Sequence, residues 1–419
     1  MFLLNPPTVR PLEIFTSMPD KYRRTGERSL WADVNQGGRL ADSFLEGPVF
    51  DAQGNLYVTD IPFGRVFRID PRGEWDLVAQ WDGEPNGMKF LNADQLLITD
   101  YRNGLVVLDI ASGQVRPYLE RRNSERFKGV NDLVFDSRGN LYFTDQGQTG
   151  LHDPTGRVYR LAPDGRLDML LSNVPSPNGI VLSNDERFLF VAATRGNCVW
   201  RMPLLADGGV SKAGQFFTSY GPSGPDGLAM DSAGQLLVAN PGLAYVWVLN
   251  HRAEPVQVLR AETGASLTNL AFGGADRRTL YVTDSTHGRI LRARLEAPGL
   301  ALRMDGRTGR ETGRRTGSPS TGGIDAWPVS TIAPTPSSHP LFPARGLGPP
   351  ARPPPDAGTS RHLWHHRCLP RSFRPRIAGR PAGARRPEGG GAAVVAPAAR
   401  FPGAAALRWS PARGRGPSR

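Results

Sequence analysis

One sequence pattern recurs six times between residues 44 and 284 of the 419-residue chain. Each copy has an apolar run, a turn with Gly, Asn or Asp, and an alternating β-branched and aromatic run, which is typical of a β-hairpin. The copies are "FLEGPVFDAQGNLYVTD", "EPNGMKFLNADQLLITD", "GVNDLVFDSRGNLYFTD", "SPNGIVLSNDERFLFVA", "GPDGLAMDSAGQLLVAN" and "LTNLAFGGADRRTLYVTD". Because such repetition constrains a fold more strongly than any local signal, the chain is predicted to be a repeat of antiparallel strands.

A third strand, such as "GRVFRID" or "GRVYRLA", follows most hairpins, and a fourth, such as "WDLVAQW" or "LDMLLSN", usually comes next. Four antiparallel strands form one blade of a propeller. The polar residues that open the six copies are 40 to 48 positions apart, which fits the propeller period of about 40 to 50 residues. These residues are Glu46, Asn86, Asn131, Asn178, Asp226 and Asn269. The sequence therefore predicts an all-β protein, a six-bladed β-propeller.

The closure of the ring is also predicted. The sixth copy has no obvious fourth strand after Leu295, whereas "PLEIFTSMP" near the N-terminus resembles "AGQFFTSYG" before the fifth copy. We expect the N-terminal strand to complete the last blade, so that residues 1–300 form the propeller.

Residues 301–419 differ sharply in composition. They hold 20 Arg, no Lys and 5 acids, a net charge of +15, whereas residues 1–300 have a net charge of −3. This low-complexity tail, rich in Pro, Gly, Ala and Arg, is predicted to be disordered because it cannot bury enough apolar surface. It either binds nucleic acid or anionic lipid by counterion release or is an out-of-frame reading of a GC-rich gene, and its exclusive use of Arg favours the second interpretation.

Location and partners are predicted from what the sequence lacks. Cys198 and Cys368 make no disulfide framework. The N-terminus does not match a signal peptide, and no apolar run is long enough to span a membrane. We expect a cytoplasmic protein with a small-molecule partner, no membrane partner and no nucleic-acid partner for the propeller; the sequence leaves its oligomeric state open.

The six opening residues suggest a metal site. The first strand of each blade lines the central channel, so these residues converge on one mouth of it. All six offer a side-chain oxygen and none is His or Cys, a set that favours Ca²⁺ or Mg²⁺ over Zn²⁺. Glu46 and Asp226 also balance a divalent charge. The alternative is that Asn, Asp, Pro and Gly simply form turns, which explains the glycines but not the restriction of carboxylates to two positions.

Several motifs carry a resemblance to a known family. "EGPVFD", "GVNDLVFDSRGNLYFTD", "PTGRVYRL", "SPNGIVLS" and "GPDGLAMD" occur in family-like order and spacing. Over residues 10–297 the chain resembles the senescence marker protein/gluconolactonase family, which includes lactonases and diisopropylfluorophosphatase. This resemblance implies that Glu46, Asn131, Asn178 and Asp226 hold a catalytic divalent metal, with Ca²⁺ favoured and Mg²⁺, Mn²⁺ or Zn²⁺ as alternatives.

Within that family, "DPTGRVYRL" and "PNGI" are most similar to the calcium-dependent lactonases. Some of these proteins have a second calcium site, built from acidic and hydroxyl residues beside the third-copy motif. Here the corresponding segment is "RFKGVND", and Phe127 and Lys128 argue against a second site.

The expected reaction is metal-assisted ester hydrolysis, in which the cation polarises a lactone carbonyl. Asp226 is expected to be both a ligand and the proton-transfer group that activates water. Asn86 is predicted to bind substrate, as are Tyr101, Arg102 and Asn103, which follow the "ITD" of the second copy.

Other polar residues suit structural roles. The repeated "TD" motif marks Asp60, Asp100, Asp145 and Asp284 as blade structure, and no serine motif accompanies the histidines His152, His251 and His287. Two rival functions remain. One is an organophosphate or fluorophosphate hydrolase with Asp226 as nucleophile, and the other is a non-catalytic binding scaffold, which would not need carboxylates in the ring.

Overall fold

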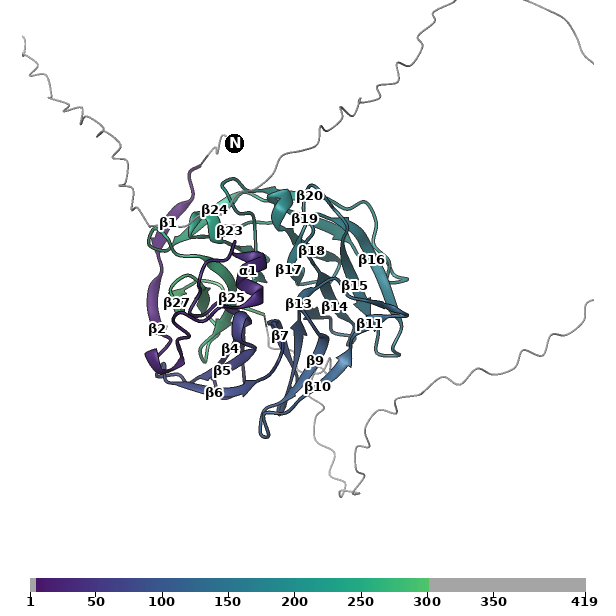
Figure 1. The fold of residues 1–419 in the computed structure, drawn as a ribbon. Coiled ribbons are helices and arrows are strands. Elements are labelled where there is room, and N and C mark those ends of the chain that lie inside the picture. The colour runs from purple at the N-terminus through teal and green to yellow at the C-terminus, as the bar shows by residue number, and fades with distance from the viewer. Residues whose placement is uncertain (1–4, 301–419) are drawn as a thin grey trace, which may run out of the picture. The chain divides into compact units, whose positions relative to one another are not determined.

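The computed structural model describes residues 5–300. Within this part, six antiparallel β-sheets stand side by side around a central channel (Figure 1), so the predicted six-bladed β-propeller is confirmed. The predicted tail, residues 301–419, lies outside the described residues.

Each sheet runs from an inner strand at the channel to an outer strand at the rim. The first three sheets contain β3 Leu45–Phe50, β4 Leu56–Asp60, β5 Arg65–Ile69 and β6 Trp75–Gln80; β7 Pro85–Asn92, β8 Gln95–Asp100, β9 Gly104–Asp109 and β10 Val115–Leu119; and β13 Val130–Phe135, β14 Leu141–Asp145, β15 Gly156–Leu161 and β16 Leu167–Val174. A small hairpin, β11 Arg121–Arg122 and β12 Glu125–Arg126, precedes the third sheet.

The last three sheets follow the same order. They contain β17 Pro177–Leu182, β18 Phe188–Ala193, β19 Cys198–Pro203 and β20 Gly214–Thr218; β21 Leu228–Met230, β22 Leu236–Asn240, β23 Tyr245–Leu249 and β24 Pro255–Arg260; and β25 Leu267–Gly273, β26 Thr279–Asp284 and β27 Arg289–Arg294. Short 3₁₀ turns, η2 Ile61–Phe63, η3 Thr194–Gly196 and η4 Pro241–Leu243, connect second and third strands in three of the sheets.

The N-terminal segment joins two sheets. β2 (Glu13–Ser17) pairs antiparallel with β27 and becomes the outer strand of the sixth sheet. β1 (Thr8–Pro11) pairs in parallel with β24 and adds a fifth strand to the fifth sheet, which the sequence pattern did not predict. The first strands of the chain therefore hold the last two blades together.

The apolar core lies between neighbouring blades. Along β9, Leu105 and Val107 pack toward the third sheet, whereas Val106 and Leu108 pack toward the first. Side chains on a strand alternate between its two faces, so a strand buried on both faces must be apolar at nearly every position. This requirement accounts for runs such as "GLVVLD", and it gives six clusters, one between each pair of adjacent blades.

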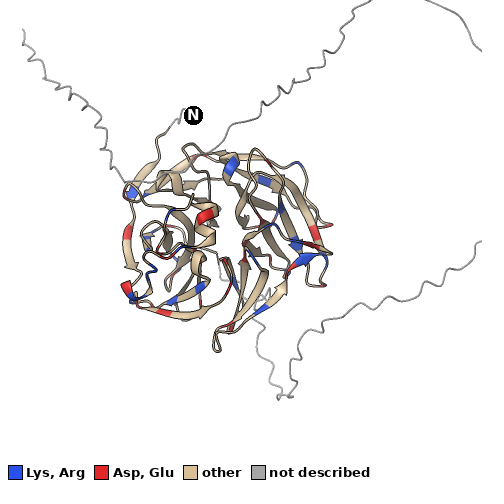
Figure 2. Cartoon of the chain, viewed as in Figure 1, with Lys and Arg blue, Asp and Glu red and all other residues tan. Residues whose placement is uncertain are grey.

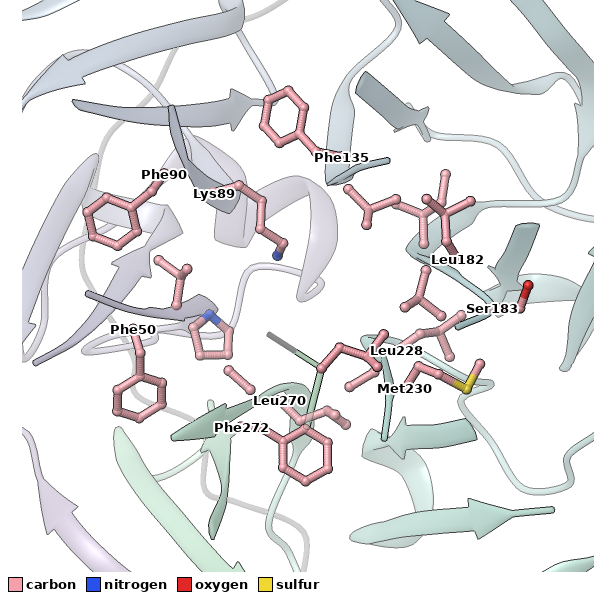
Figure 3. Close-up of a pocket in the computed structure, with 18 of the residues that line it drawn as sticks. Phe50, Lys89, Phe90, Phe135, Leu182, Ser183, Leu228, Met230, Leu270 and Phe272 are labelled. Carbon is pink, nitrogen blue, oxygen red and sulfur yellow. The ribbon is translucent and has the colours of Figure 1, made fainter. Parts of the chain in front are cut away.

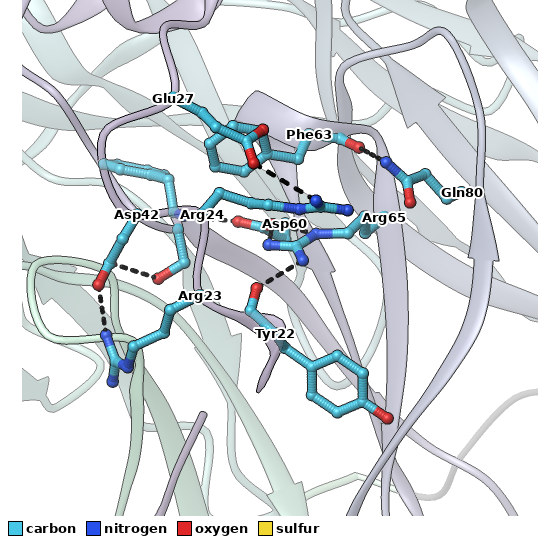
Figure 4. A network of polar contacts seen from close by, with 11 residues as sticks. Tyr22, Arg23, Arg24, Glu27, Asp42, Asp60, Phe63, Arg65 and Gln80 are labelled. Atoms are coloured by element: carbon cyan, nitrogen blue, oxygen red, sulfur yellow. Dashed lines mark hydrogen bonds and ion pairs between the residues drawn. The ribbon is translucent and has the colours of Figure 1, made fainter. Parts of the chain in front are cut away.

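The segment between β2 and β3 is anchored by a buried ion pair (Figure 4). Arg65 is only 1% exposed, and its Nε donates to Asp60 Oδ2 at 2.7 Å while its Nη1 donates to the Tyr22 carbonyl at 2.6 Å. Arg23 pairs with Asp42 at 2.8 Å in the same segment. Removing one partner of a buried pair leaves an uncompensated charge, so this contact is a strong constraint on the fold.

Acidic and basic residues are interspersed around the ring in the view of Figure 2, and neither sign collects on one side of it. That pattern differs from the continuous basic face of nucleic-acid-binding domains. Among residues 5–300, none of the helices has the length and apolar character needed to cross a membrane.

Candidate functional site

The six predicted ring residues lie at the inner strands, at one end of the channel. Five of them are within β3, β7, β13, β17 and β25, and Asp226 precedes β21 by two positions. In each of these five strands the pairing register shifts around the ring residue, as between Glu46 and Val49 in β3. Such bulges redirect a side chain out of the regular alternation. All six side chains are buried, as expected for groups packed at the axis of the ring.

Glycines follow four of the ring residues because neighbouring blades approach closely there. A Cβ on Gly47, which has φ +54°, would lie 2.1 Å from the Asn86 carbonyl oxygen, and one on Gly179 would lie 2.3 Å from the Asp226 carbonyl oxygen. A side chain at either position would therefore push adjacent inner strands apart. The turn interpretation of these glycines is thus incomplete, since Gly47 and Gly179 lie inside strands and are needed for blade contact.

Threonine hydroxyls fix the ring backbone. In four blades, a buried threonine in the second strand, or directly after it in the case of Thr194, donates to a main-chain carbonyl at or beside the ring residue of the next blade. The pairs are Thr59 with Asn86 at 2.8 Å, Thr99 with Asn131, Thr144 with Asn178 at 2.8 Å, and Thr194 with Pro225 at 2.7 Å. These bonds hold ring residues of different blades in one register.

The aspartates of the "TD" motif have a separate role. Each accepts a hydrogen bond from a main-chain N–H just before or at the start of its own blade's inner strand. The pairs are Asp60 with Phe44 at 2.7 Å, Asp100 with Glu84 at 3.0 Å, Asp145 with Gly129 at 2.8 Å, and Asp284 with Ser266 at 3.2 Å. The prediction that these aspartates are blade structure is confirmed.

Three side-chain oxygens of the ring have no hydrogen-bond donor. Asn86 Oδ1, Asn131 Oδ1 and Asp226 Oδ1 are buried and have no partner among the described residues. Other ring atoms are engaged, since Asn269 Nδ2 donates to Glu46 Oε2 at 2.9 Å. Buried oxygens without donors are costly, and three of them in one ring fit a bound cation better than they fit a purely structural role.

The electrostatics of the ring lead to the same conclusion. Burial raises the pKa of Glu46 to about 7, although hydrogen bonds from Asn269 and the Gly47 N–H oppose the shift. Burial, and then the nearby charges of Glu46 and Asp132, raise the pKa of Asp226 well above its ordinary value. Carboxylates in this arrangement repel one another without a counter-charge, and a divalent cation would supply one.

Among residues 5–300 there is no cluster of three or more His, Cys, Asp or Glu arranged to hold a metal. The candidate donor set is of another kind, with the carboxylates of Glu46 and Asp226 and the amide oxygens of Asn131 and Asn178. Hard oxygen donors of these types suit Ca²⁺ or Mg²⁺, so the residues present fit the predicted ion.

Asp132 is a buried acid that the ring prediction missed. It follows Asn131, where four other copies have glycine, and its Oδ1 accepts the Leu133 N–H at 2.8 Å. Burial raises its pKa, and the ammonium of Lys89 opposes this shift. The sequence shows that this copy has Asp132 in place of glycine, but it does not show that the Asp132 side chain is buried near Asp226.

A cavity of about 500 Å³ opens at this mouth of the channel. Its wall combines the loop after β14 with Ser176, Arg195 and Asn35 from the short helix α1 (Leu30–Asn35). Gln146 links the cavity to the ring, because its Oε1 accepts from Asn131 Nδ2 at 2.9 Å. α1 lies near the centre of the ring in Figure 1, over this mouth.

The three predicted pocket residues of the second blade have different positions. Tyr101 lies near the cavity, since its hydroxyl accepts from Gln148 Nε2 at 2.8 Å. Arg102 pairs with Asp82 at 2.5 Å, and Asn103 donates to the Asp82 carbonyl at 3.0 Å. The structure thus brings Tyr101 toward the cavity and engages Arg102 and Asn103 in their own turn.

Phe127 and Lys128, the two residues that argue against a second calcium site, have structural contacts. Lys128 Nζ donates to Thr155 Oγ1 at 2.5 Å, and Phe127 packs edge-on against Phe143 and Tyr159. An ammonium group and a phenyl ring at this place are poor neighbours for a cation.

The opposite end of the channel is apolar (Figure 3). Phe50, Phe90, Leu182 and Phe272 line it together with other inner-strand residues, and Lys89 extends its ammonium into the pocket. The channel therefore has one polar end, with the ring, and one apolar end.

Comparisons with known proteins agree with this architecture. Residues 44–286 match the family model described as the SMP-30/gluconolactonase/LRE-like region. Lactonase drp35 of Staphylococcus aureus (strain MW2) is 31% identical over 238 residues, covering 54% of this chain and 71% of that protein. Lactonase drp35 of Staphylococcus haemolyticus is 32% identical over 225 residues, covering 51% of this chain and 68% of that protein.

Among solved structures, the calcium-binding protein regucalcin of Agrobacterium tumefaciens has a TM-score of 0.58 at 22% identity. The match covers 71% of this chain and 98% of that protein. At this level of identity the likeness is one of fold.

Proposed function

Since the chain belongs to the SMP-30/gluconolactonase/LRE-like family, we propose that it is a divalent-metal-dependent hydrolase that opens a lactone. The relatives named above are lactonases, and the chain spans more than two thirds of their length. A small-molecule lactone as substrate belongs to this proposal, and a cytoplasmic location stays a prediction.

One observation carries the proposal. Asn86, Asn131 and Asp226 each leave a buried side-chain oxygen without a donor at a single mouth of the channel. Glu46, Asn131, Asn178 and Asp226 would hold the cation, with Ca²⁺ as the expected ion because only oxygen donors are present. A bound divalent cation would supply Lewis-acid polarisation of the lactone carbonyl.

The chain's own residues would do the rest of the chemistry. The Asp226 carboxylate takes a proton from the water that attacks the carbonyl carbon, the ring C–O bond breaks, and the proton passes to the departing alkoxide to give a hydroxy acid. The side chain of Asn178 lowers the pKa of Asp226 and so favours the charged carboxylate that this role needs. Asn86 is a candidate substrate contact, since its buried Oδ1 lacks a donor and lies in the same ring.

The test is a turnover assay of the full chain with neutral lactones and with phosphotriesters, before and after chelation. The proposal expects lactone hydrolysis that chelation abolishes and Ca²⁺, Mg²⁺, Mn²⁺ or Zn²⁺ restores to different extents. Phosphotriester turnover well above lactone turnover would favour the rival organophosphate hydrolase. A complete lack of turnover with every cation would favour a binding scaffold.

A further inference from the structure

Arg195 carries an unpaired positive charge at the mouth cavity. It lies in η3, which connects β18 and β19, and its side chain is exposed and lines the cavity. Within residues 5–300 it makes no hydrogen bond and no ion pair, whereas Arg102 and Arg157 each pair with an acid. A guanidinium left free in a cavity wall is available to a ligand.

The rest of the cavity wall has no opposing charge. None of the residues described as its lining is Asp or Glu. Arg195 lies close enough to the ring for its charge to lower the pKa of Asp226. The cavity is therefore a positively charged chamber directly beside the candidate reaction centre, and such a chamber attracts anions.

A second group converges with Arg195 on the same wall. A Cβ built on Gly150 would lie 3.1 Å from His152 Nδ1 and 3.6 Å from Arg195 Cβ, so both side chains flank Gly150. Nearby, Gln148 Nε2 contacts Asn35 Oδ1 at 3.0 Å, which holds the loop against α1. This bond orders the loop that carries His152, whereas the Arg195 side chain is held by no hydrogen bond among the described residues.

A simpler role for Arg195 would be to compensate the negative charge of the buried acids in the ring. Lys89 does this for Asp132 from the other end of the channel. An offsetting role would affect every substrate equally, because it acts through Asp226. A binding role would affect only substrates that carry a negative charge.

We propose that Arg195 and His152 form a subsite for an anionic substituent, a carboxylate or a phosphate, on the lactone that this protein hydrolyses. This inference rests on the proposed lactonase function. Arg recognises both anions through two parallel N–H bonds, and His152 adds a neighbouring donor. The preferred substrate is therefore a lactone that carries a carboxylate or a phosphate substituent.

The test compares kcat/KM for a neutral, a carboxylated and a phosphorylated lactone of the same ring size. For Arg195→Gln we expect about a 10- to 100-fold loss on the two charged lactones, mainly through KM, because a charge-assisted bond is removed. The neutral lactone should change less than about twofold. Arg187→Gln, an exposed arginine in the turn before β18, is the matched control and should change none of the three.

The two charged substrates identify the anion, since the larger loss marks the natural substituent. An equal loss on all three lactones would overturn the subsite, because Arg195 would then act through Asp226. Equal wild-type kcat/KM for charged and neutral lactones would overturn it too. If no lactone is hydrolysed, the proposed function fails separately, and calorimetry with succinate and inorganic phosphate still tests the subsite. Wild-type binding that Arg195→Gln loses would support the subsite, and equal or absent binding would overturn it.

Discussion

The ring at the channel mouth and the layer of "TD" aspartates are both sets of buried polar groups repeated around the propeller, but they differ in how their oxygens are satisfied. In Asp60 and Asp100 both carboxylate oxygens accept hydrogen bonds, one of them from a main-chain N–H at the start of the same blade. In the ring, Asn131 and Asp226 keep oxygens without donors. The exception in the aspartate layer is Asp145, whose Oδ2 has no hydrogen bond but lies 3.9 Å from Arg157 Nη1. The layer consists of aspartates alone, whereas the ring varies between carboxylate and amide. The difference indicates that the aspartate layer stabilises the fold and that the ring gives up stability for binding.

The largest expected effect comes from Asp226→Asn. This change keeps an oxygen but removes the basic carboxylate, and loss of a general base costs about 10² to 10⁴ in rate. The measurement is kcat for a lactone at saturating divalent cation. The melting temperature of the chelated variant should not fall, because a buried charge has been removed. Recovery of wild-type kcat at saturating cation would leave Asp226 as a ligand only.

Asp60→Asn should show the opposite pattern. It leaves Arg65 as a buried and unpaired charge, which costs about 3 to 5 kcal/mol of unfolding free energy. We expect the midpoint of urea unfolding to fall while kcat of the folded protein is unchanged. Asp60→Asn and Asp226→Asn are thus matched changes of one carboxylate in two layers. If Asp60→Asn lost turnover but kept its stability, the proposed difference in role between the aspartate layer and the ring would be contradicted.

The third prediction concerns the stability of the metal-free protein as the pH changes. Glu46 has a folded-state pKa of about 7 against an ordinary value of 4.5. The folded state therefore holds this proton more tightly than the unfolded state does. The contribution of Glu46 to the free energy of unfolding should be greatest below about pH 4.5. It should fall by on the order of 2 to 3 kcal/mol as the pH rises to 7. Urea unfolding of chelated wild type and Glu46→Gln measures this, and equal slopes against pH would contradict the shift.

Glu46→Gln should also weaken cation binding. It keeps an oxygen ligand and loses one charge, so the affinity should fall by at least about tenfold. Excess cation should restore most of the rate, in contrast to Asp226→Asn. Calorimetric titration of the chelated protein gives the affinity, and an unchanged affinity would remove Glu46 from the ligand set.

The smallest expected effect is at Arg102. Its pair with Asp82 is exposed, and exposed pairs contribute about 0 to 1 kcal/mol. Arg102→Gln should therefore change kcat/KM less than about twofold if this residue belongs only to its turn. A loss above tenfold would return Arg102 to the substrate pocket, as the sequence predicted.

The sequence predicts the parts of the molecule that repeat. The six inner strands and the ring positions follow from the period, and the apolar runs of β8 and β9 follow from burial on both faces. Contacts across the mouth have no local pattern, because Gln148 and Asn35 meet from positions 113 residues apart. For the same reason, the sequence does not predict that α1 lies over the channel or that Arg195 lines the cavity. Residues that break the repeat, such as Asp132, are visible in the sequence, but their surroundings are not.

The most direct test of the central claim is a count of divalent cations bound per chain, measured together with lactone hydrolysis. Wild type, Asp60→Asn and the double variant Glu46→Gln/Asp226→Asn would be chelated and then titrated with Ca²⁺. The account predicts that wild type and Asp60→Asn bind a cation and regain hydrolysis together, and that the double variant does neither. Full hydrolysis by exhaustively chelated wild type with no bound metal would contradict it.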